Sequence, residues 1–355
     1  MLRPFLNGIG RASALAIGAG FGYGLLCGGD TVSCGSARDI NDLRSRVASL
    51  SRQLDDLSLG NSPAAATQGT GLAFKSDLHR GVPKFGLFVN SGSVQVTAQL
   101  AHMGYDWLLI DAQHGASSHT TLVPMLGAIR DGGAKSLVRV GGFDDVAGIQ
   151  QALDAGADGV LVPYINTAEE ARQAVASCRY PLGSASPNRA PAGQAGTRSV
   201  YFPQPCMNKD GLLGYAGAAN DNVIIALQVE TADCIKNIEE IGAIEGIDIL
   251  FLGQNDLCMS MGLYDKYEFP HMYTSPELAA ATDKLLRVCS RRGIAPGIFL
   301  FGTDKVPAFR AKGFHFVSVG NDLHHLLVAG TGMLGELKAS SKGEWSPRPN
   351  PMVQL

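Results

Sequence analysis

The sequence has no excess of charge of one sign and no paired-cysteine motif. Lys and Arg number 29 against 32 Asp and Glu, so no basic surface favours nucleic acid as a partner. None of the seven cysteines forms a C-x-x-C pair, and no His/Cys cluster has the spacing of a zinc site. This pattern fits buried or free thiols in a reducing compartment, although Cys27 and Cys34 could pair in an oxidising space.

Charge is also missing from Ala12 to Gly29, a glycine-rich run of 18 residues preceded by Arg3 and Arg11. Such a run is at the lower edge of the length that spans a bilayer. The arginines and the missing acids also fit an organellar targeting segment, while a secretory signal fits less well because no clear cleavage site follows. We therefore expect residues 1–30 to be a targeting segment or a membrane helix, with the mitochondrion favoured.

Residues 38–59 carry a short heptad pattern of apolar side chains. The spacings are 3, 4, 3, 4 and 3, for Ile40, Leu43, Val47, Leu50, Leu54 and Leu57. Because the pattern covers fewer than three heptads, it predicts either an amphipathic helix or a short oligomerising coil. Residues 1–59 could thus associate with a membrane or a membrane complex. Residues 60–80 have the composition of a linker, and residues 341–355 are predicted to be a C-terminal tail.

From residue 81 to 340, apolar strand-like runs alternate with helical patterns. The runs are nearly continuous in hydrophobicity, as in strands that are buried on both faces. Eight such units predict an α/β fold, a (β/α)8 TIM barrel with an N-terminal helical extension. An open doubly wound sheet is the alternative, disfavoured because no G-x-G-x-x-G follows the first strand. The expected strands are Lys84–Asn90, Asp106–Asp111, Lys135–Val140, Gly159–Pro163, Val223–Glu230, Asp248–Gly253, Ala295–Phe301 and His315–Gly320.

Two acids, Glu230 and Asp256, follow consecutive predicted strands. The carboxyl ends of barrel strands meet at one face, so these side chains are expected to lie close together. Carboxylates are the oxygen ligands that Mg²⁺ and similar ions prefer, which predicts a metal site. The alternative is that both acids simply stabilise helix N-termini.

Other polar residues at strand ends complete a candidate site for a small oxo acid. Arg139 ends an apolar strand, where a guanidinium can bind a carboxylate with two hydrogen bonds or form a structural salt bridge. Asp111 and Gln228 are candidates for substrate binding, although a buried glutamine with satisfied partners fits Gln228 nearly as well. His114 is a candidate base, although a lone histidine in a loop can equally be an ordinary polar residue. Asp154 is a candidate partner that would orient it, or else a solvated helix residue.

Several of these segments resemble motifs of one enzyme family. They read YDWLLIDAQHG, LVRV, QQALDAGADGVLVP, LQVET, LFLGQNDL and FVSVGNDLHHL. Together they are similar to the class II, pyruvate-dependent aldolases of the 2-keto-3-deoxy sugar acid and 4-hydroxy-2-oxo-heptanedioate type, a family that includes macrophomate synthase. The resemblance extends over residues 86–330, nearly the whole predicted barrel.

The resemblance implies a metal-dependent carbon–carbon lyase that splits a 4-hydroxy-2-oxo acid into pyruvate and an aldehyde. It implies that Glu230 and Asp256 hold a divalent ion, Mg²⁺, Mn²⁺ or similar, and that Arg139 binds the carboxylate of the small 2-oxo acid. His114, paired with Asp154, would move the hydroxyl proton. It also implies a homo-oligomer, a trimer or hexamer, with sites near subunit contacts.

The chain departs from the family pattern at several points. Gln113 stands where an acid usually precedes the histidine, and Gln254 replaces the usual proline of the metal loop. Residues 184–195 form an extra insert, and the first eighty residues have no counterpart. Two other functions therefore stay open: a non-catalytic barrel tethered to a membrane assembly, and a lyase that acts on a CoA thioester.

Overall fold

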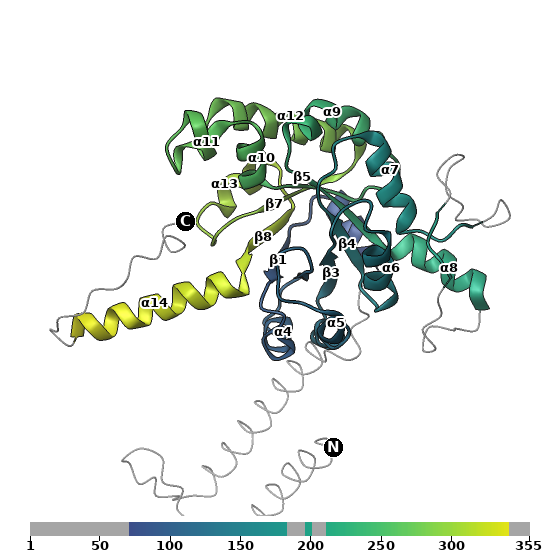
Figure 1. Cartoon of the computed structure of the whole chain (residues 1–355), viewed down its shortest axis with the longest axis horizontal. Helices are drawn as coiled ribbons and strands as arrows, with labels where there is room; N and C mark the ends of the chain where they lie inside the picture. Colours follow the sequence, from purple (N-terminus) through teal and green to yellow (C-terminus); the bar gives the residue numbers. More distant parts are fainter. Residues whose placement is uncertain (1–70, 183–195, 201–210, 341–355) are drawn as a thin grey trace, which may run out of the picture. The chain divides into compact units, whose positions relative to one another are not determined.

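The computed structural model describes residues 71–182, 196–200 and 211–340. Eight parallel strands close a barrel in sequence order, which confirms the predicted (β/α)8 fold and rules out the open sheet (Figure 1). Each strand begins and ends within two residues of the predicted positions. The strands are β1 Lys84–Val89, β2 Trp107–Asp111, β3 Lys135–Arg139, β4 Gly159–Val162, β5 Ile224–Val229, β6 Ile249–Leu252, β7 Ala295–Phe299 and β8 Phe316–Asn321.

Helices surround the strands, and their ends follow ordinary capping chemistry. The Ser275 hydroxyl accepts the N–H of Leu278 where α12 begins, and Gly293 ends that helix in the left-handed conformation. The helices are α3 Gly71–His79, α4 Val94–Ala101, α5 His119–Gly132, α6 Val146–Asp154, α7 Ala168–Ser177, α8 Gly211–Asn222, α9 Ala232–Ile241, α10 Gln254–Ser260, α11 Leu263–Lys266, η2 His271–Thr274, α12 Pro276–Arg292, α13 Val306–Lys312 and α14 Asp322–Ser340.

Helix α3 corrects the predicted linker over residues 60–80, because the chain is already helical from Gly71. Phe74 and Leu78 are buried in the cluster that fills the barrel, and the ring of Phe74 meets that of Phe316 edge to face. Lys75, also buried, lies 3.5 Å from Asp248 and donates to the carbonyl of Val223. The helix therefore packs against residues at the amino ends of the strands. It escaped prediction because a short helix that starts at glycine looks like linker in sequence.

We expect a chain that begins at Gly71 to fold as stably as the full chain, because every contact of α3 is kept. A chain that begins at Gly81 loses the burial of Phe74 and Leu78, a cost of about 3–6 kcal/mol in the free energy of unfolding. Chemical unfolding of both chains measures the difference. Equal stability of the two truncated chains would show that α3 does not close the barrel.

Aromatic rings fill the barrel interior. Trp107 of β2 and Phe316 of β8 stack with ring centroids 4.0 Å apart. Gly86 of β1 makes room for them, since a Cβ at that position would lie 2.1 Å from the indole of Trp107. This packed core occupies the lower layers of the barrel and leaves the carboxyl ends of the strands for polar side chains.

The alternation of side chains along each strand decides which residues reach that end. On β2, Trp107 and Leu109 belong to the interior cluster, so Asp111 continues on the interior side. On β3, Leu137 is interior and Arg139 follows it two residues later. The same spacing on β5 leads from Ala226 to Gln228. The two-residue period of these strands thus aligns the candidate residues toward one axis.

Helix α14 differs from the helices that pack around the barrel. It follows β8 and extends away from the strands (Figure 1). Within this helix only Asp322 and His324 are buried, whereas six large apolar side chains are exposed by more than two fifths. These are Leu323, Leu326, Val328, Met333, Leu334 and Leu337.

Several predicted features lie outside the described residues. They are the segment 1–30, the heptad 38–59, residues 60–70 of the linker, the insert 184–195 and the tail 341–355. Within the described part, none of the helices has the length and apolar character needed to cross a bilayer. The four cysteines described there are buried free thiols, as predicted: Cys178, Cys234, Cys258 and Cys289.

Candidate active site at the carboxyl end of the barrel

Asp111 and Arg139 are direct neighbours in the register of β2 and β3. The Arg139 Nε donates to one carboxylate oxygen of Asp111 at 2.9 Å and its Nη2 to the other at 2.7 Å. Asn90 and the N–H groups of Gln113 and His114 also donate to this carboxylate, which has no exposed surface. Both carboxylate oxygens of Asp111 are therefore occupied by hydrogen bonds within the protein. It was predicted to bind substrate, but it holds Arg139 instead.

Opposing effects act on the pKa of Asp111 in this pair. Burial alone would raise the pKa of Asp111, but the hydrogen bond and charge of Arg139, with the two backbone N–H groups, outweigh it. The pKa of Asp111 is therefore held below its ordinary value, and the pair is ionic. A charge-assisted pair with two parallel bonds fixes the plane of the guanidinium.

Arg139 remains available to a ligand. Its side chain is 11% exposed, it lines the main pocket of the described residues, and it lies 5.3 Å from the ring of Phe88. Among the described residues, its Nη1 makes no hydrogen bond. The guanidinium can thus keep its pair with Asp111 and still donate to a carboxylate.

Glu230 follows β5 directly and is 3% exposed. One carboxylate oxygen accepts the N–H of Tyr164 at 2.8 Å, and the other accepts the amide of Gln228. Tyr164 takes a left-handed φ of 56°, uncommon for a side chain of its size. Burial raises the pKa of Glu230, and the nearby negative charge of Asp256 adds to the rise. Two carboxylates thus lie near each other at this site, and the charge of Arg139 opposes only part of the rise in the pKa of Glu230.

Gln228 was predicted to bind the oxo group of a substrate, and its amide nitrogen is instead engaged by Glu230. Its oxygen Oε1 is buried and has no partner among the described residues. Gly253 allows this close arrangement, because a Cβ there would lie 3.0 Å from Nε2 of Gln228 and 3.1 Å from Cβ of Glu230. A buried acceptor without a donor is costly, so the site is suited to a ligand that supplies positive charge or a proton.

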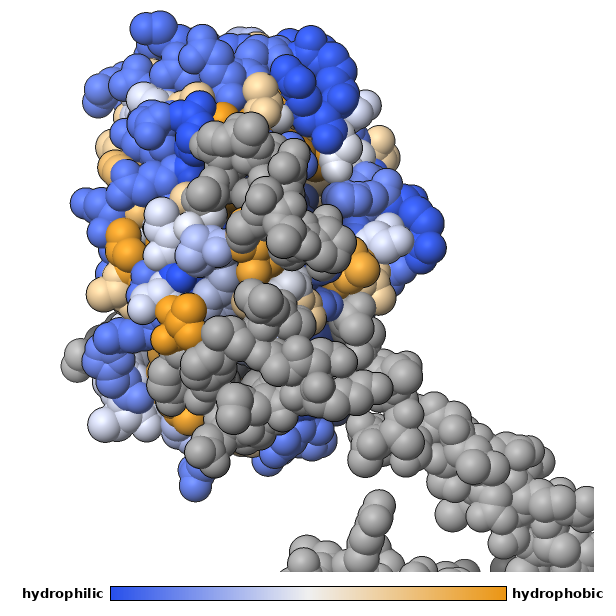
Figure 2. All heavy atoms as spheres, turned by 90° about the vertical axis from the view of Figure 1, so that its right-hand side faces the viewer, coloured by the Kyte–Doolittle hydropathy of each residue, from blue (hydrophilic) through white to orange (hydrophobic). Residues whose placement is uncertain are grey.

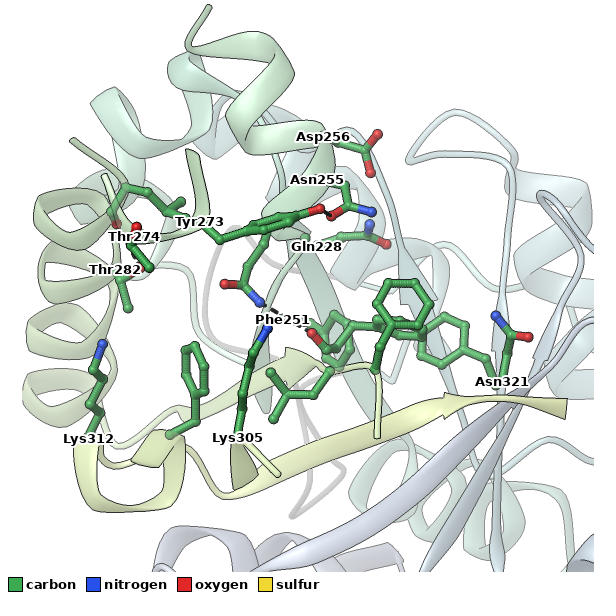
Figure 3. A pocket seen from close by; sticks show the side chains of 18 of the residues that line it. Gln228, Phe251, Asn255, Asp256, Tyr273, Thr274, Thr282, Lys305, Lys312 and Asn321 are labelled. Atoms are coloured by element: carbon green, nitrogen blue, oxygen red, sulfur yellow. Dashed lines mark hydrogen bonds between the residues drawn. The ribbon is translucent and has the colours of Figure 1, made fainter. Parts of the chain in front are cut away.

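Asp256 lies in the first turn of α10, is exposed and lines the pocket (Figure 3). Among the described residues no group of three His, Cys, Asp or Glu is arranged to hold a metal ion. The candidate donors are the carboxylates of Glu230 and Asp256, which are close enough for the charge of one to affect the pKa of the other, and the unpartnered oxygen of Gln228. Such an all-oxygen set fits Mg²⁺ or Mn²⁺, which bind through one or two carboxylates and leave other positions for water and substrate.

The structure separates His114 from Asp154. His114 is exposed at the carboxyl end of β2 and lines the pocket. Asp154 ends α6, which runs back toward the amino ends of the strands, and it pairs there with Arg198 at 2.7 Å. The predicted pairing of Asp154 with His114 is therefore not formed within one chain.

The pocket that Arg139, His114 and Asp256 line has a volume of about 610 Å³. Most of the residues that line it were not singled out from the sequence, among them Asn90, Gly253 and Lys305. Asn90 directly follows β1, so its position at a strand end was an available signal. The role of Gly253 depends on distances across the barrel, which no local pattern reveals.

Comparisons with known proteins identify the family of this chain. Residues 84–329 match the family model described as HpcH/HpaI aldolase/citrate lyase. The chain is 33% identical over 250 residues to 4-hydroxy-2-oxo-heptane-1,7-dioate aldolase of Escherichia coli, covering 70% of this chain and 88% of the relative. It is 32% identical over 267 residues to 2-dehydro-3,6-dideoxy-6-sulfogluconate aldolase of Pseudomonas putida, covering 75% and 97%.

Solved structures show the same fold. One from Burkholderia cenocepacia J2315, described as an HpcH/HpaI aldolase/citrate lyase family protein, has a TM-score of 0.64 at 30% identity. The alignment covers 75% of this chain and 99% of that one. Macrophomate synthase, at 24% identity and a TM-score of 0.65 over 78% of this chain and 93% of its own, shares the fold. The chain belongs to the HpcH/HpaI aldolase/citrate lyase family.

Proposed function

We propose that the protein is a divalent-metal-dependent lyase that cleaves a 4-hydroxy-2-oxo acid into pyruvate and an aldehyde. The observation that carries this proposal is that one pocket contains both the Arg139 guanidinium and Asp256, beside the buried carboxylate of Glu230. An oxo acid presents a carboxylate and an adjacent carbonyl oxygen, which match an arginine next to a metal site. The two aldolases named above support the same reaction class.

The residues of the chain would divide the work as follows. Arg139 binds the substrate carboxylate and so orients the 2-oxo group toward Glu230 and Asp256. These two acids would hold the ion, which would act as a Lewis acid toward the oxo group. A base removes the proton of the 4-hydroxyl, the bond between C3 and C4 breaks, and its electron pair passes into the pyruvate enolate. The aldehyde leaves and C3 takes a proton.

His114 is the candidate base because it lines the pocket beside Arg139. A water molecule could carry the proton between the histidine and the substrate hydroxyl. The neutral Gln113 beside it lowers the local negative charge relative to the acid that is usual in the family.

A pyruvate-release assay over a panel of 4-hydroxy-2-oxo acids, with and without EDTA, tests the proposal. We expect release from at least one member of the panel and its loss with EDTA. The alternative, a non-catalytic tethered barrel, predicts no release from any member. That alternative has less support, because a barrel without activity would not need Arg139 and Asp256 in one pocket beside the buried Glu230. A thioester lyase would instead release a CoA product.

We further propose that the protein is a homo-oligomer, of which a trimer or a hexamer is expected. The exposed apolar side chains of α14 support this, since they would be covered by a second copy. On the described surface that is visible in Figure 2, on the side away from α14, hydrophobic residues lie scattered among hydrophilic ones. Assembly would also explain the separation of His114 and Asp154, because only a neighbouring copy could bring an Asp154 to this His114.

Replacing Leu326 and Leu337 together with glutamate is expected to reduce the oligomer to smaller species. These side chains are 71% and 65% exposed in one chain, so the change costs an isolated chain little, but charges in a covered apolar contact cost several kcal/mol. Light scattering after size exclusion measures the mass. Val123→Glu, at an apolar residue 58% exposed on α5, is the matched control. An unchanged mass in the double variant would remove α14 from the interface.

We also propose that the protein is located in an organelle, with the mitochondrion favoured, and that it associates with a membrane through residues 1–59. Its support is the uncharged run from Ala12 to Gly29 after two arginines. Carbonate extraction of cell fractions, with N-terminal sequencing of the mature protein, tests it. A mature chain that begins after Gly29 in a soluble fraction would favour a targeting peptide over an anchor.

A further inference from the structure

The side chain of Asp256, one of the two proposed metal ligands, is not fixed by contacts of its own. It is exposed, and within the part of the chain that the structure describes its carboxylate makes no hydrogen bond and no ion pair. Glu230, in contrast, accepts hydrogen bonds from Tyr164 and Gln228. The position of Asp256 therefore depends on the backbone that carries it, the first turn of α10.

The helix α10 gives this turn little support. It has seven residues, and its N-cap residue is Gly253, which has no side chain to accept a hydrogen bond from the first turn. A helix of this length is not stable through its local hydrogen bonds alone. Contacts with other elements must therefore hold the turn in place.

Two such contacts come from the side chains that directly precede Asp256. The Nε2 of Gln254 donates to the carbonyl oxygen of Phe299, the last residue of β7, at 3.3 Å. The Oδ1 of Asn255 accepts the hydroxyl of Tyr273 at 2.5 Å, and Figure 3 shows this bond next to Asp256. All five of these residues line the pocket. The turn is thus attached to two other elements, β7 and η2.

Tyr273 is itself well anchored. It lies in η2 beside Met272, which is fully buried, and two residues before the buried Ser275 that caps α12. Burial raises the pKa of Tyr273, and its neighbours Tyr264 and Asp256 add to the rise, so the hydroxyl stays protonated. The hydroxyl is therefore a permanent donor on a fixed element.

We propose that Tyr273 is a positioning residue for the metal site, because its hydroxyl holds Asn255 and so fixes the turn that carries Asp256. This role rests on the proposed function, in which Asp256 binds a divalent ion. Tyr273 is not a ligand of the ion, and it acts through the backbone of α10. The connection that runs from α10 through α11 and η2 to α12 thereby contributes to the affinity of the site for its ion.

Removal of one hydroxyl tests this role without requiring turnover. Tyr273→Phe keeps the ring and loses the bond to Asn255. Calorimetry with Mn²⁺ in the absence of substrate should show an affinity reduced by about 3–10-fold, as for loss of one hydrogen bond. Tyr267→Phe is the matched control, because the Tyr267 hydroxyl donates to Glu277 at 2.9 Å in the same connection and does not line the pocket. Chemical unfolding should show similar losses of stability in both variants, whereas Tyr267→Phe should keep its affinity for Mn²⁺.

A double variant shows whether the effect passes through Asn255. Asn255→Ala should weaken Mn²⁺ binding to a similar extent, and adding Tyr273→Phe to it should cause no further loss. Unchanged Mn²⁺ affinity in Tyr273→Phe, or additive losses in the double variant, would overturn the role of Tyr273. Weaker pyruvate binding with unchanged Mn²⁺ affinity would also overturn it, since Tyr273 would then contact the substrate.

Failure of the proposed function gives a different result. If the wild-type protein binds no Mn²⁺, the metal site is absent and the role of Tyr273 is overturned with it. If the wild-type protein binds Mn²⁺ and the variants differ as expected, but no hydroxy-oxo acid releases pyruvate, the role of Tyr273 stands and the proposed reaction is wrong.

Discussion

Replacing Asp256 with alanine is expected to abolish metal-dependent turnover while the barrel stays folded. The proposed site has only two carboxylates, and a divalent ion held by one carboxylate binds weakly. Asp256 is exposed in the first turn of α10, and its charge opposes ionisation of Glu230. Its removal should therefore cost little stability. Calorimetric titration with Mn²⁺ should show the loss of affinity directly, and circular dichroism should show the retained fold.

A matched variant separates the loss of a ligand from a general change in charge. Asp283→Ala removes an exposed acid from α12, outside the pocket, and should bind Mn²⁺ as the unaltered protein does. Full activity in Asp256→Ala, or in protein freed of divalent ions, would contradict the metal-dependent mechanism. Weak Mn²⁺ binding in both variants would show that distributed surface charge, rather than a defined site, attracts the ion.

Much of this fold could be predicted because the strands of a parallel barrel have a simple and recognisable sequence pattern. Strands buried on both faces need continuous apolar runs, and eight of them were recognisable. The same logic placed Arg139, Glu230 and Asp256 after strands. Arg139 and Asp256 line one pocket, and the buried Glu230 is near enough to both for their charges to affect its pKa. What the pattern could not decide was which partner each polar group takes. Asp111 became the partner of Arg139 because their strands are neighbours in register.

Other errors have a common cause in contacts between distant parts of the chain. The helix α3 is defined by burial of Phe74 and Leu78 against strands far along the sequence, and a local pattern cannot show that burial. The motif that carries Asp154 identified its helix but not the direction of that helix relative to His114. The exposed apolar face of α14 is likewise hidden in sequence, because its leucines look like those of any packed helix.

Replacing Arg139 with lysine is expected to weaken pyruvate binding by about 5–150-fold, the equivalent of 1–3 kcal/mol for a charge-assisted hydrogen bond. Lysine keeps the positive charge but not the planar fork that bonds Asp111 through Nε and Nη2. An ammonium that stays with the buried Asp111 cannot also reach the position of Nη1. Calorimetry with pyruvate in the presence of Mn²⁺ measures the change, and Arg172→Lys on the surface of α7 is the control.

The dependence of stability on pH distinguishes the two roles of Arg139. In the folded protein the pKa of Asp111 is lowered, so the pair stabilises the fold above the pKa of an unfolded aspartate and loses this effect as pH falls through the lower folded value. Arg139→Lys should therefore lose stability at neutral pH and show a weaker dependence on acid. If unfolding changes in this way but pyruvate binding does not, Arg139 serves only to neutralise Asp111. If both change, the pair with Asp111 is what holds the guanidinium in place for the substrate carboxylate.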